Sequence, residues 1–132
     1  IIAIPEFVKA KGLTEERVLA LSYLGFAEGE PMMYKHQYIV TNRTESLAEE
    51  EVKNCTFAEL VEKVAAVIPI RSLLTINAVT INSQKAKLLR IRENSPGFCI
   101  EQTLFTADEI AVAFGAYVCR GDKYRFTSKF NY

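Results

Sequence analysis

The strongest candidate for binding chemistry in this sequence is a helix start at Thr56. The run Thr56-Phe57-Ala58-Glu59 is a capping-box pattern, in which the Thr and Glu side chains satisfy two backbone N–H groups. The remaining N–H groups and the positive end of the helix dipole can bind a carboxylate or a phosphate. Arg71 follows the same predicted helix beyond Pro69 and could return beside its start. An ordinary cap with a surface arginine would give the same pattern, so both interpretations stay open.

A second feature is a stripe of small residues, because Ala111, Ala113 and Gly115 fall on one face of a predicted strand. Small side chains leave room above a strand for a packed helix or for a ligand. A packed helix is the commoner cause of such a stripe.

Conventional catalytic residues are sparse. His36 is the only histidine, and no serine or cysteine stands at a recognisable spacing from it. Glu101 has no obvious paired acid, and the run Glu49-Glu50-Glu51 is typical of a solvated surface. The six glycines form no phosphate-binding loop. We therefore predict no catalytic residues, and we do not expect an enzyme.

The three cysteines, Cys55, Cys99 and Cys119, lie far apart and form no Cys-x-x-Cys pair. With a single histidine in the chain, this spacing argues against a zinc site. We expect free thiols in a reducing cytoplasm, and we predict neither a metal nor a cofactor. The sequence has no signal peptide and no apolar run long enough to cross a membrane, so no membrane partner is expected.

The length of 132 residues predicts one domain spanning 1–132, and an apolar fraction of 49% is ample for a packed core. The formal net charge is zero. Because nucleic-acid binding needs a basic face, we do not expect this chain to hold DNA by itself. The sequence begins inside an apolar run without an initiator methionine. We expect a fragment of a longer protein.

Hydrophobic periodicity predicts the secondary structure. Strands are expected at residues 1–4, 18–27, 32–40, 71–81, 98–106 and 110–119. Helices are expected at 5–11, at 46–52, from 57 to the proline at 69, and from a cap at Asn82 or Ser83 onward. Residues 123–127 are either a short strand or the frayed end of the preceding one. Strands joined by short turns are antiparallel, so the fold class is α+β, with helices packed on a mainly antiparallel sheet.

Two diverged copies of one unit make up most of the chain. Lys9-Ala10-Lys11-Gly12-Leu13 recurs as Lys85-Ala86-Lys87-Leu88-Leu89, and each copy is followed by a predicted hairpin. Two copies are too few for a solenoid. They predict one sheet built with a pseudo-twofold internal repeat and a cleft between its halves.

The final stretch resembles a family signature. The run Arg120-Gly121-Asp122-Lys123-Tyr124-Arg125-Phe126 is similar to the Arg-Gly-Asp-Arg-Tyr-x-Phe ending of UTRA domains, the effector-binding halves of HutC-type GntR transcription regulators. The turn Phe26-Ala27-Glu28-Gly29-Glu30-Pro31 looks like that family's "ADGxP" turn. Lys85-Ala86-Lys87-Leu88-Leu89-Arg90-Ile91 is similar to its "A-x-x-L-x-I" helix. Ile68-Pro69 lies between the long helix and the next strand, as in the family.

This resemblance implies a chorismate-lyase-like fold that binds a small ligand in a cleft and forms a homodimer. It also implies that operator DNA is bound only by an N-terminal winged helix-turn-helix that these 132 residues do not include. Ligand binding would change the placement of the two DNA-binding domains, which is coupling between distinct sites.

The resemblance also carries over a set of effector-binding positions. Several polar residues of family members that sense sugar phosphates are replaced here, so a different small anionic metabolite, a carboxylate or phosphate, is expected, with Lys35 as a second cation. The positions are Tyr23, Gly25, Lys35, Cys55, Thr56, Phe57, Arg71, Ala113 and Cys119.

Two rival functions remain open. A chorismate-lyase-like enzyme acting on a small dicarboxylate would share the fold, although a fold alone is poor support for a reaction. A purely structural dimerisation domain would have its cleft filled by side chains such as Tyr23 and Phe105. A homodimer is also expected, because the edges of an incomplete sheet need covering and pairing with a second copy is one solution.

Overall fold

The computed structural model describes residues 1–13, 17–42 and 47–132. Its elements follow one another as strand, helix and hairpin, then two helices, then strand, helix and hairpin again. They are β1 (Ile2–Ala3), α1 (Glu6–Lys9), β2 (Arg17–Ala27), β3 (Glu30–Val40), α2 (Glu49–Asn54), α3 (Phe57–Ala65), β4 (Arg71–Thr80), α4 (Ser83–Leu89), β5 (Pro96–Phe105) and β6 (Ala111–Arg120). This order confirms the α+β class.

All strands that the structure describes form one antiparallel sheet in the order β1-β2-β3-β6-β5-β4. The two hairpins meet at its centre, where β3 pairs with β6 from Met33↔Cys119 to Ile39↔Ala113. The strand order is symmetric about this pair, which confirms the pseudo-twofold arrangement predicted from the repeat. The halves differ in their outer strands, because β1 has two residues and β4 has ten.

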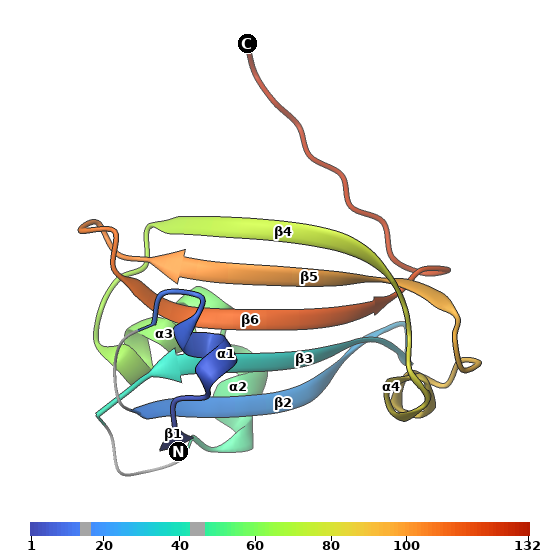
Figure 1. Cartoon of the computed structure of the whole chain (residues 1–132), viewed down its shortest axis with the longest axis horizontal. Coiled ribbons are helices and arrows are strands. Elements are labelled where there is room, and N and C mark those ends of the chain that lie inside the picture. Colours follow the sequence, from blue (N-terminus) through green and yellow to red (C-terminus); the bar gives the residue numbers. More distant parts are fainter. Residues whose placement is uncertain (14–16, 43–46) are drawn as a thin grey trace.

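The helices cover both faces of the sheet, with α1 in front and α2 and α3 behind it in Figure 1. On the α1 face, the Phe7 ring meets Tyr38 with 5.5 Å between ring centroids, and Lys85 of α4 lies over Tyr34 on the same face. On the other face, Phe57 of α3 lies against the backbone of Gly115. The sheet is therefore the middle of three layers.

Helix α3 forms because its sequence satisfies both of its ends and presents one apolar face. The predicted capping box is present, and Leu60, Val61 and Val64 are buried against the sheet. The helix ends at Ala65, because Ala66 takes a left-handed conformation with φ 57°. The prediction that Pro69 ends it is wrong by a few residues. Truncating Leu60 to alanine should cost about 2–5 kcal/mol of stability.

The shorter helices depart from their predicted bounds. Helix α1 is only one turn, Glu6–Lys9, and its predicted extension to residue 11 is wrong. Helix α2 begins at Glu49 and ends at Asn54, later than the predicted 46–52, and Ser46 lies outside the described residues. Asn82 caps α4 by accepting a hydrogen bond from the Lys85 N–H at 3.0 Å, so the predicted cap is confirmed at Asn82.

The run that carries the family resemblance is a structural clasp. Arg120 donates two hydrogen bonds to the Asp122 carboxylate, at 3.1 and 2.8 Å, and a third to the Pro31 carbonyl at 3.4 Å. Gly121 packs so closely that a Cβ there would lie 2.6 Å from the Pro96 carbonyl oxygen. Residues 123–127 form no strand, so of the two alternatives for this segment the short strand is wrong. From Asp122 onward the chain leaves the sheet and passes beyond β4 (Figure 1).

Candidate ligand-binding site

A hollow of about 310 Å³ lies on the α3 face of the sheet. The start of α3 forms one wall, residues of five strands form the floor, and Tyr124 closes one side. Its lining residues are Tyr23, Met33, Lys35, Gln37, Cys55, Thr56, Phe57, Leu74, Ile100, Tyr117 and Tyr124. We call this space the α3 hollow.

Side-chain hydrogen bonds cross the sheet beneath the α3 hollow. The Tyr23 hydroxyl donates to Gln37 Oε1 at 2.7 Å, and Gln37 Nε2 donates to Tyr117 Oη at 3.1 Å. The Tyr117 hydroxyl then donates to Gln102 Oε1 at 3.2 Å, and Gln102 Nε2 donates to Ser72 Oγ at 3.0 Å. These five residues belong to β2, β3, β6, β5 and β4, so the network holds five strands and orients the polar floor.

The two tyrosines of this network are neutral donors at physiological pH. Burial raises the pKa of Tyr117 to about 12, against a smaller opposing effect of its hydrogen bond with Gln37. Burial also raises the pKa of Tyr23. Neither phenol is poised to act as a base near neutral pH, because a general base works best with a pKa close to the working pH. The floor is suited to hydrogen-bonding a ligand.

Lys35 is the charged side chain among the described residues that line the α3 hollow. Its Nζ lies 5.4 Å from the centroid of the Tyr23 ring, within the range of a cation–π contact. Gly25 makes space for it, because a Cβ on Gly25 would lie 2.9 Å from Lys35 Cε. Gly25 therefore positions the lysine without lining the hollow.

The start of α3 supplies the second anion-binding element. Thr56 Oγ1 accepts from the Glu59 N–H at 3.2 Å, and Glu59 Oε1 accepts from the Thr56 N–H at 3.3 Å. A helix leaves its first N–H groups without intrahelical acceptors, and the capping box does not use those of Phe57 and Ala58. With the helix dipole, these groups can hold an anion beside Thr56 and Cys55.

The structure brings some of the predicted site residues to the hollow and places the others elsewhere. Five line the α3 hollow: Tyr23, Lys35, Cys55, Thr56 and Phe57. Ala113 and Cys119 share its face of the sheet, in register with Ile39 and Met33, but both are fully buried and do not line the hollow. Burial raises the pKa of the Cys119 thiol to about 11, as expected for a packed cysteine.

Arg71 lies elsewhere, and the prediction that it returns beside Thr56 is wrong. It pairs with Phe105 at the far end of β5, about 17 Å along the strand from Ile100 of the hollow. Successive residues of a strand point to opposite faces, and Ser72 and Leu74 point to the face of the α3 hollow. The Arg71 side chain therefore projects from the other face of the sheet. There its Nη1 contacts Glu109 Oε1 at 2.8 Å.

Sequence reasoning missed Gln37, Tyr117 and Tyr124, although two of them carried a signal. Gln37 and Tyr117 lie on the same faces of their strands as the predicted positions Lys35 and Cys119, so strand alternation in the sequence could have identified them. Tyr124 gave no such signal, because it follows the end of β6 and reaches the hollow only through the turn after Arg120.

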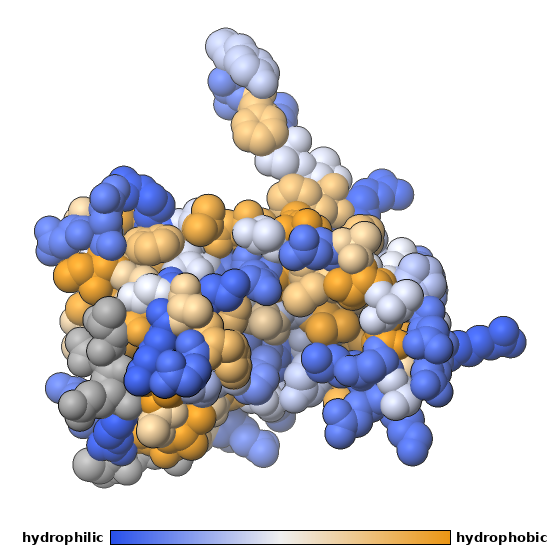
Figure 2. All heavy atoms as spheres, viewed as in Figure 1, coloured by the Kyte–Doolittle hydropathy of each residue, from blue (hydrophilic) through white to orange (hydrophobic). Residues whose placement is uncertain are grey.

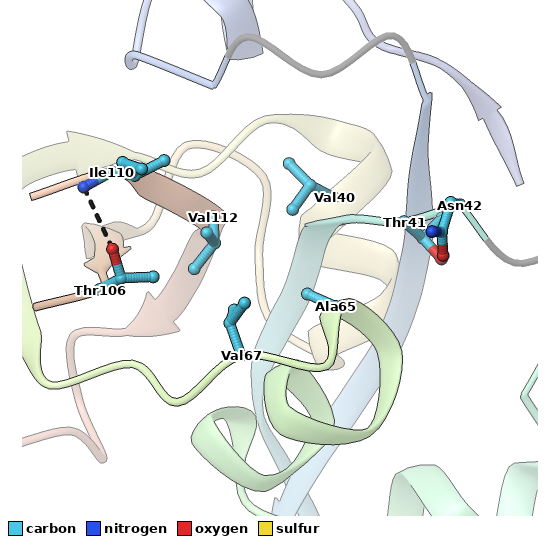
Figure 3. Close-up of a pocket in the computed structure, with 8 residues that line it drawn as sticks. All are labelled: Val40, Thr41, Asn42, Ala65, Val67, Thr106, Ile110 and Val112. Atoms are coloured by element: carbon cyan, nitrogen blue, oxygen red, sulfur yellow. Dashed lines mark hydrogen bonds between the residues drawn. The ribbon is translucent and has the colours of Figure 1, made fainter. Parts of the chain in front are cut away.

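A second hollow of about 280 Å³ lies at the other end of α3. Figure 3 shows Val40, Ala65, Val67 and Val112 gathered around it, with the Thr106 hydroxyl accepting from the Ile110 N–H at 3.3 Å. None of the described residues that line this space has an ionisable side chain.

Metal and membrane features are also absent from the described residues. No group of three His, Cys, Asp or Glu side chains there could hold a metal ion. His36 lies on the α1 face, stacked on Tyr38 with 4.6 Å between ring centroids, and burial followed by the charge of Lys85 lowers its pKa. In the same part of the chain, none of the helices has the length and apolar character needed to span a membrane.

Similar folds occur in solved structures. The effector domain of PhnF from Mycobacterium smegmatis superposes with a TM-score of 0.82 at 16% identity, covering 99% of this chain and 82% of that one. A GntR-family transcriptional regulator from Enterococcus faecalis V583 gives 0.81 at 18% identity, with 97% and 94% covered. The possible transcriptional regulator YydK from Bacillus subtilis superposes with a TM-score of 0.80 at 15% identity. The match covers 97% of this chain and 58% of the YydK chain.

Among curated proteins, no sequence matches this chain. The family model of the UTRA domain matches residues 3–125. This match confirms the resemblance drawn from the Arg120–Phe126 run, and it gives no support to the lyase alternative. The chain belongs to the UTRA domain family and is the effector-sensing domain of a transcription regulator.

Proposed function

We propose that the α3 hollow binds a small metabolite with one anionic group, and that this binding is regulatory and not catalytic. One arrangement carries the proposal: Lys35 and the start of α3 both border the hollow, above a floor of hydrogen-bonding side chains. A carboxylate or phosphate would sit between the lysine and the N–H groups of Phe57 and Ala58. The remainder of the ligand would hydrogen-bond to Gln37 and Tyr117.

Charge and size narrow the ligand class. One cation and one helix start match a single anionic group better than the two carboxylates of a dicarboxylate substrate. A volume of about 310 Å³ lies at the small end of ligand sites. These features favour a compact ligand with one anionic group, and with fewer hydroxyl groups than a sugar phosphate, over a large effector.

The regulatory step would be transmitted through dimerisation and a DNA-binding domain. We propose that this domain works in the cytoplasm as a homodimer, within a longer regulator whose N-terminal domain reads operator DNA. The chain covers only 58% of the length of YydK, which is consistent with such a further domain. A ligand that bridges α3 and the sheet would shift the equilibrium between a conformation that binds DNA and one that does not. The size of the shift is set by the difference between the ligand's affinities for these two conformations.

A thermal-shift screen of inorganic phosphate, sugar phosphates, simple carboxylates and amino acids tests the site. A ligand at about a hundred times its dissociation constant should stabilise the fold by about 2.7 kcal/mol. Lys35→Met should remove the response, whereas Arg71→Ala and Lys87→Met, on other surfaces, should keep it. The site assignment fails if no anion raises the melting temperature, or if Lys35→Met leaves a response unchanged.

A further inference from the structure

A further hollow, of about 380 Å³, lies between α2 and β2. We call this space the α2 hollow. Four of its lining residues are aliphatic, and Glu49 and Lys53 border it from α2. The described lining residues are Leu21, Ser22, Tyr23, Leu24, Leu47, Glu49, Val52 and Lys53. The aliphatic part of this lining suits an apolar chain better than a polar group.

The α2 hollow adjoins the α3 hollow along the boundary between β2 and β3. Leu21 of the α2 hollow pairs with Gln37 of the α3 hollow, and Tyr23 pairs with Lys35. Paired residues project to the same face of a sheet, and α2 and α3 both lie on that side (Figure 1). Among the residues that the structure describes, Tyr23 is the one that lines both hollows. Its side chain therefore stands at their junction.

Two contacts from β3 hold Tyr23 at this junction. The Tyr23 hydroxyl donates to Gln37 Oε1 at 2.7 Å, and Lys35 Nζ lies over the Tyr23 ring, 5.4 Å from its centroid. Gln37 is only 2% exposed, so this hydrogen bond is shielded from water. The ring cannot turn away from the junction without losing both contacts.

We propose that Tyr23 sets the size of the ligand by closing the α3 hollow toward the α2 hollow. An anion with a short tail fits within the α3 hollow, whereas a long alkyl chain has to displace the tyrosine ring. A smaller residue at this position joins the two hollows and provides an aliphatic subsite for such a chain. The inference rests on the proposed function, because it requires that the anion binds beside Lys35.

Two homologous series of ligands test this size limit: straight-chain alkyl phosphates and straight-chain carboxylates, each from methyl to octyl. Isothermal titration calorimetry compares the unaltered chain with Tyr23→Ala. The unaltered chain should bind the octyl members more weakly than the butyl members. In Tyr23→Ala the affinity should rise by about fourfold for each methylene group that enters the α2 hollow. Tyr23→Leu, which also shortens the side chain, serves the same comparison if the alanine variant fails to fold.

Three matched variants identify where the alkyl chain lies. Tyr23→Phe keeps the ring and should still prefer butyl to octyl members. Val52→Trp, added to Tyr23→Ala, fills the α2 hollow and should remove the gain in affinity. Tyr34→Ala should behave like the unaltered chain, because Tyr34 lies under Lys85 on the opposite face of the sheet. That face is the one in Figure 2, where hydrophilic side chains cluster over α4.

The outcomes separate this inference from the proposed function. If octyl members gain nothing in Tyr23→Ala and Tyr23→Leu, although short anions bind and Lys35→Met abolishes that binding, the size limit is wrong and the proposed site stands. The size limit is also wrong if the unaltered chain prefers octyl to butyl members, or if the gain persists with Val52→Trp. If neither series binds the unaltered chain or any variant, the proposed site and the size limit both fall.

Discussion

The side chain of Tyr117 lies against the backbone of Gly115, two residues earlier on the same strand. A Cβ built on Gly115 would lie 2.4 Å from Tyr117 Oη and 3.4 Å from the Phe57 ring. The small residue therefore makes room for both a packed helix and a folded-over tyrosine. This contact places the Tyr117 hydroxyl between Gln37 and Gln102, where it completes the polar floor of the α3 hollow.

Gly115→Ala should displace Tyr117 and destabilise the fold by about 1–3 kcal/mol, because the added methyl group overpacks the site. Urea denaturation measures this loss. The matched test is a double-mutant cycle with Tyr117→Leu, in which the alanine should cost much less than in the unaltered chain. Additive effects would show that the contact between residues 115 and 117 is not the cause.

Tyr117→Phe should cost about 1–3 kcal/mol, because it leaves the buried Gln37 amide and the Gln102 oxygen without a partner. Chemical denaturation measures it, with Tyr34→Phe on the opposite face as the control. Equal losses in both variants would contradict a special role for the network.

Stability should fall between about pH 10 and pH 12 through Tyr117. Its pKa is raised to about 12 in the folded state, so the folded chain holds its proton over a range in which the unfolded chain releases it. The shifted pKa of Tyr117 stabilises the fold by about 2–3 kcal/mol. This stabilisation is complete below the pKa of the unfolded state, about 10, and is lost as pH rises through the pKa of the folded state. Urea midpoints at pH 9, 10 and 11 should fall less steeply in Tyr117→Phe. If the urea midpoints fall equally steeply with pH in Tyr117→Phe, Tyr117 is not the cause of the loss of stability.

Thr56→Ala should destabilise α3 by about 1 kcal/mol, because the Glu59 N–H loses its acceptor. Thr56→Ser should restore most of this, and Glu59→Gln should be nearly neutral because glutamine also completes the capping box. Circular dichroism during thermal unfolding compares the three variants. Full stability of Thr56→Ala would mean that the cap contributes nothing.

Arg120→Lys should loosen the end of β6, because lysine cannot make the paired hydrogen bonds to Asp122. The expected result is faster amide hydrogen exchange around Gly97 and Gly121, with the centre of β6 unaffected. Lys123→Met, in the same turn but outside the clasp, is the control. The clasp has no such role if exchange rates near residue 121 are the same in the Arg120→Lys variant.

Asp122 adds a pH dependence in the acid range. Its hydrogen bonds from Arg120 lower its carboxyl pKa, so the stabilisation is present above the ordinary pKa of a carboxyl and is lost as pH falls through the lowered value. Acid unfolding followed by fluorescence should be shifted to higher pH in Arg120→Lys. An unshifted acid transition in that variant would contradict the assignment.

Local patterns were enough to predict much of the fold. The strand patterns in 18–27 and 32–40, the capping box at Thr56 and the helix over the second Lys-Ala-Lys copy depend on near neighbours in the chain, and each is found in the structure. The helix at the first copy is shorter than predicted and ends at Lys9. The resemblance carried by the Arg120–Phe126 run also led to the correct family. In the fold Arg120 of this run ties the end of β6 to Pro31 near the start of β3, and Tyr124 is the residue of the run that lines the hollow.

Tertiary structure alone decided which residues meet at the site. Arg71 is one position away from Ser72 of the polar network, yet the pleat of β4 sends it to the opposite face, and the pairing with Phe105 sets it at the far end of the sheet. Gln37, Tyr117 and Gln102 meet only through the register of three strands. Sequence determined the elements because helix caps and strand alternation are local interactions. Register and face depend on pairing between residues as far apart in the sequence as Met33 and Cys119, which no local pattern specifies.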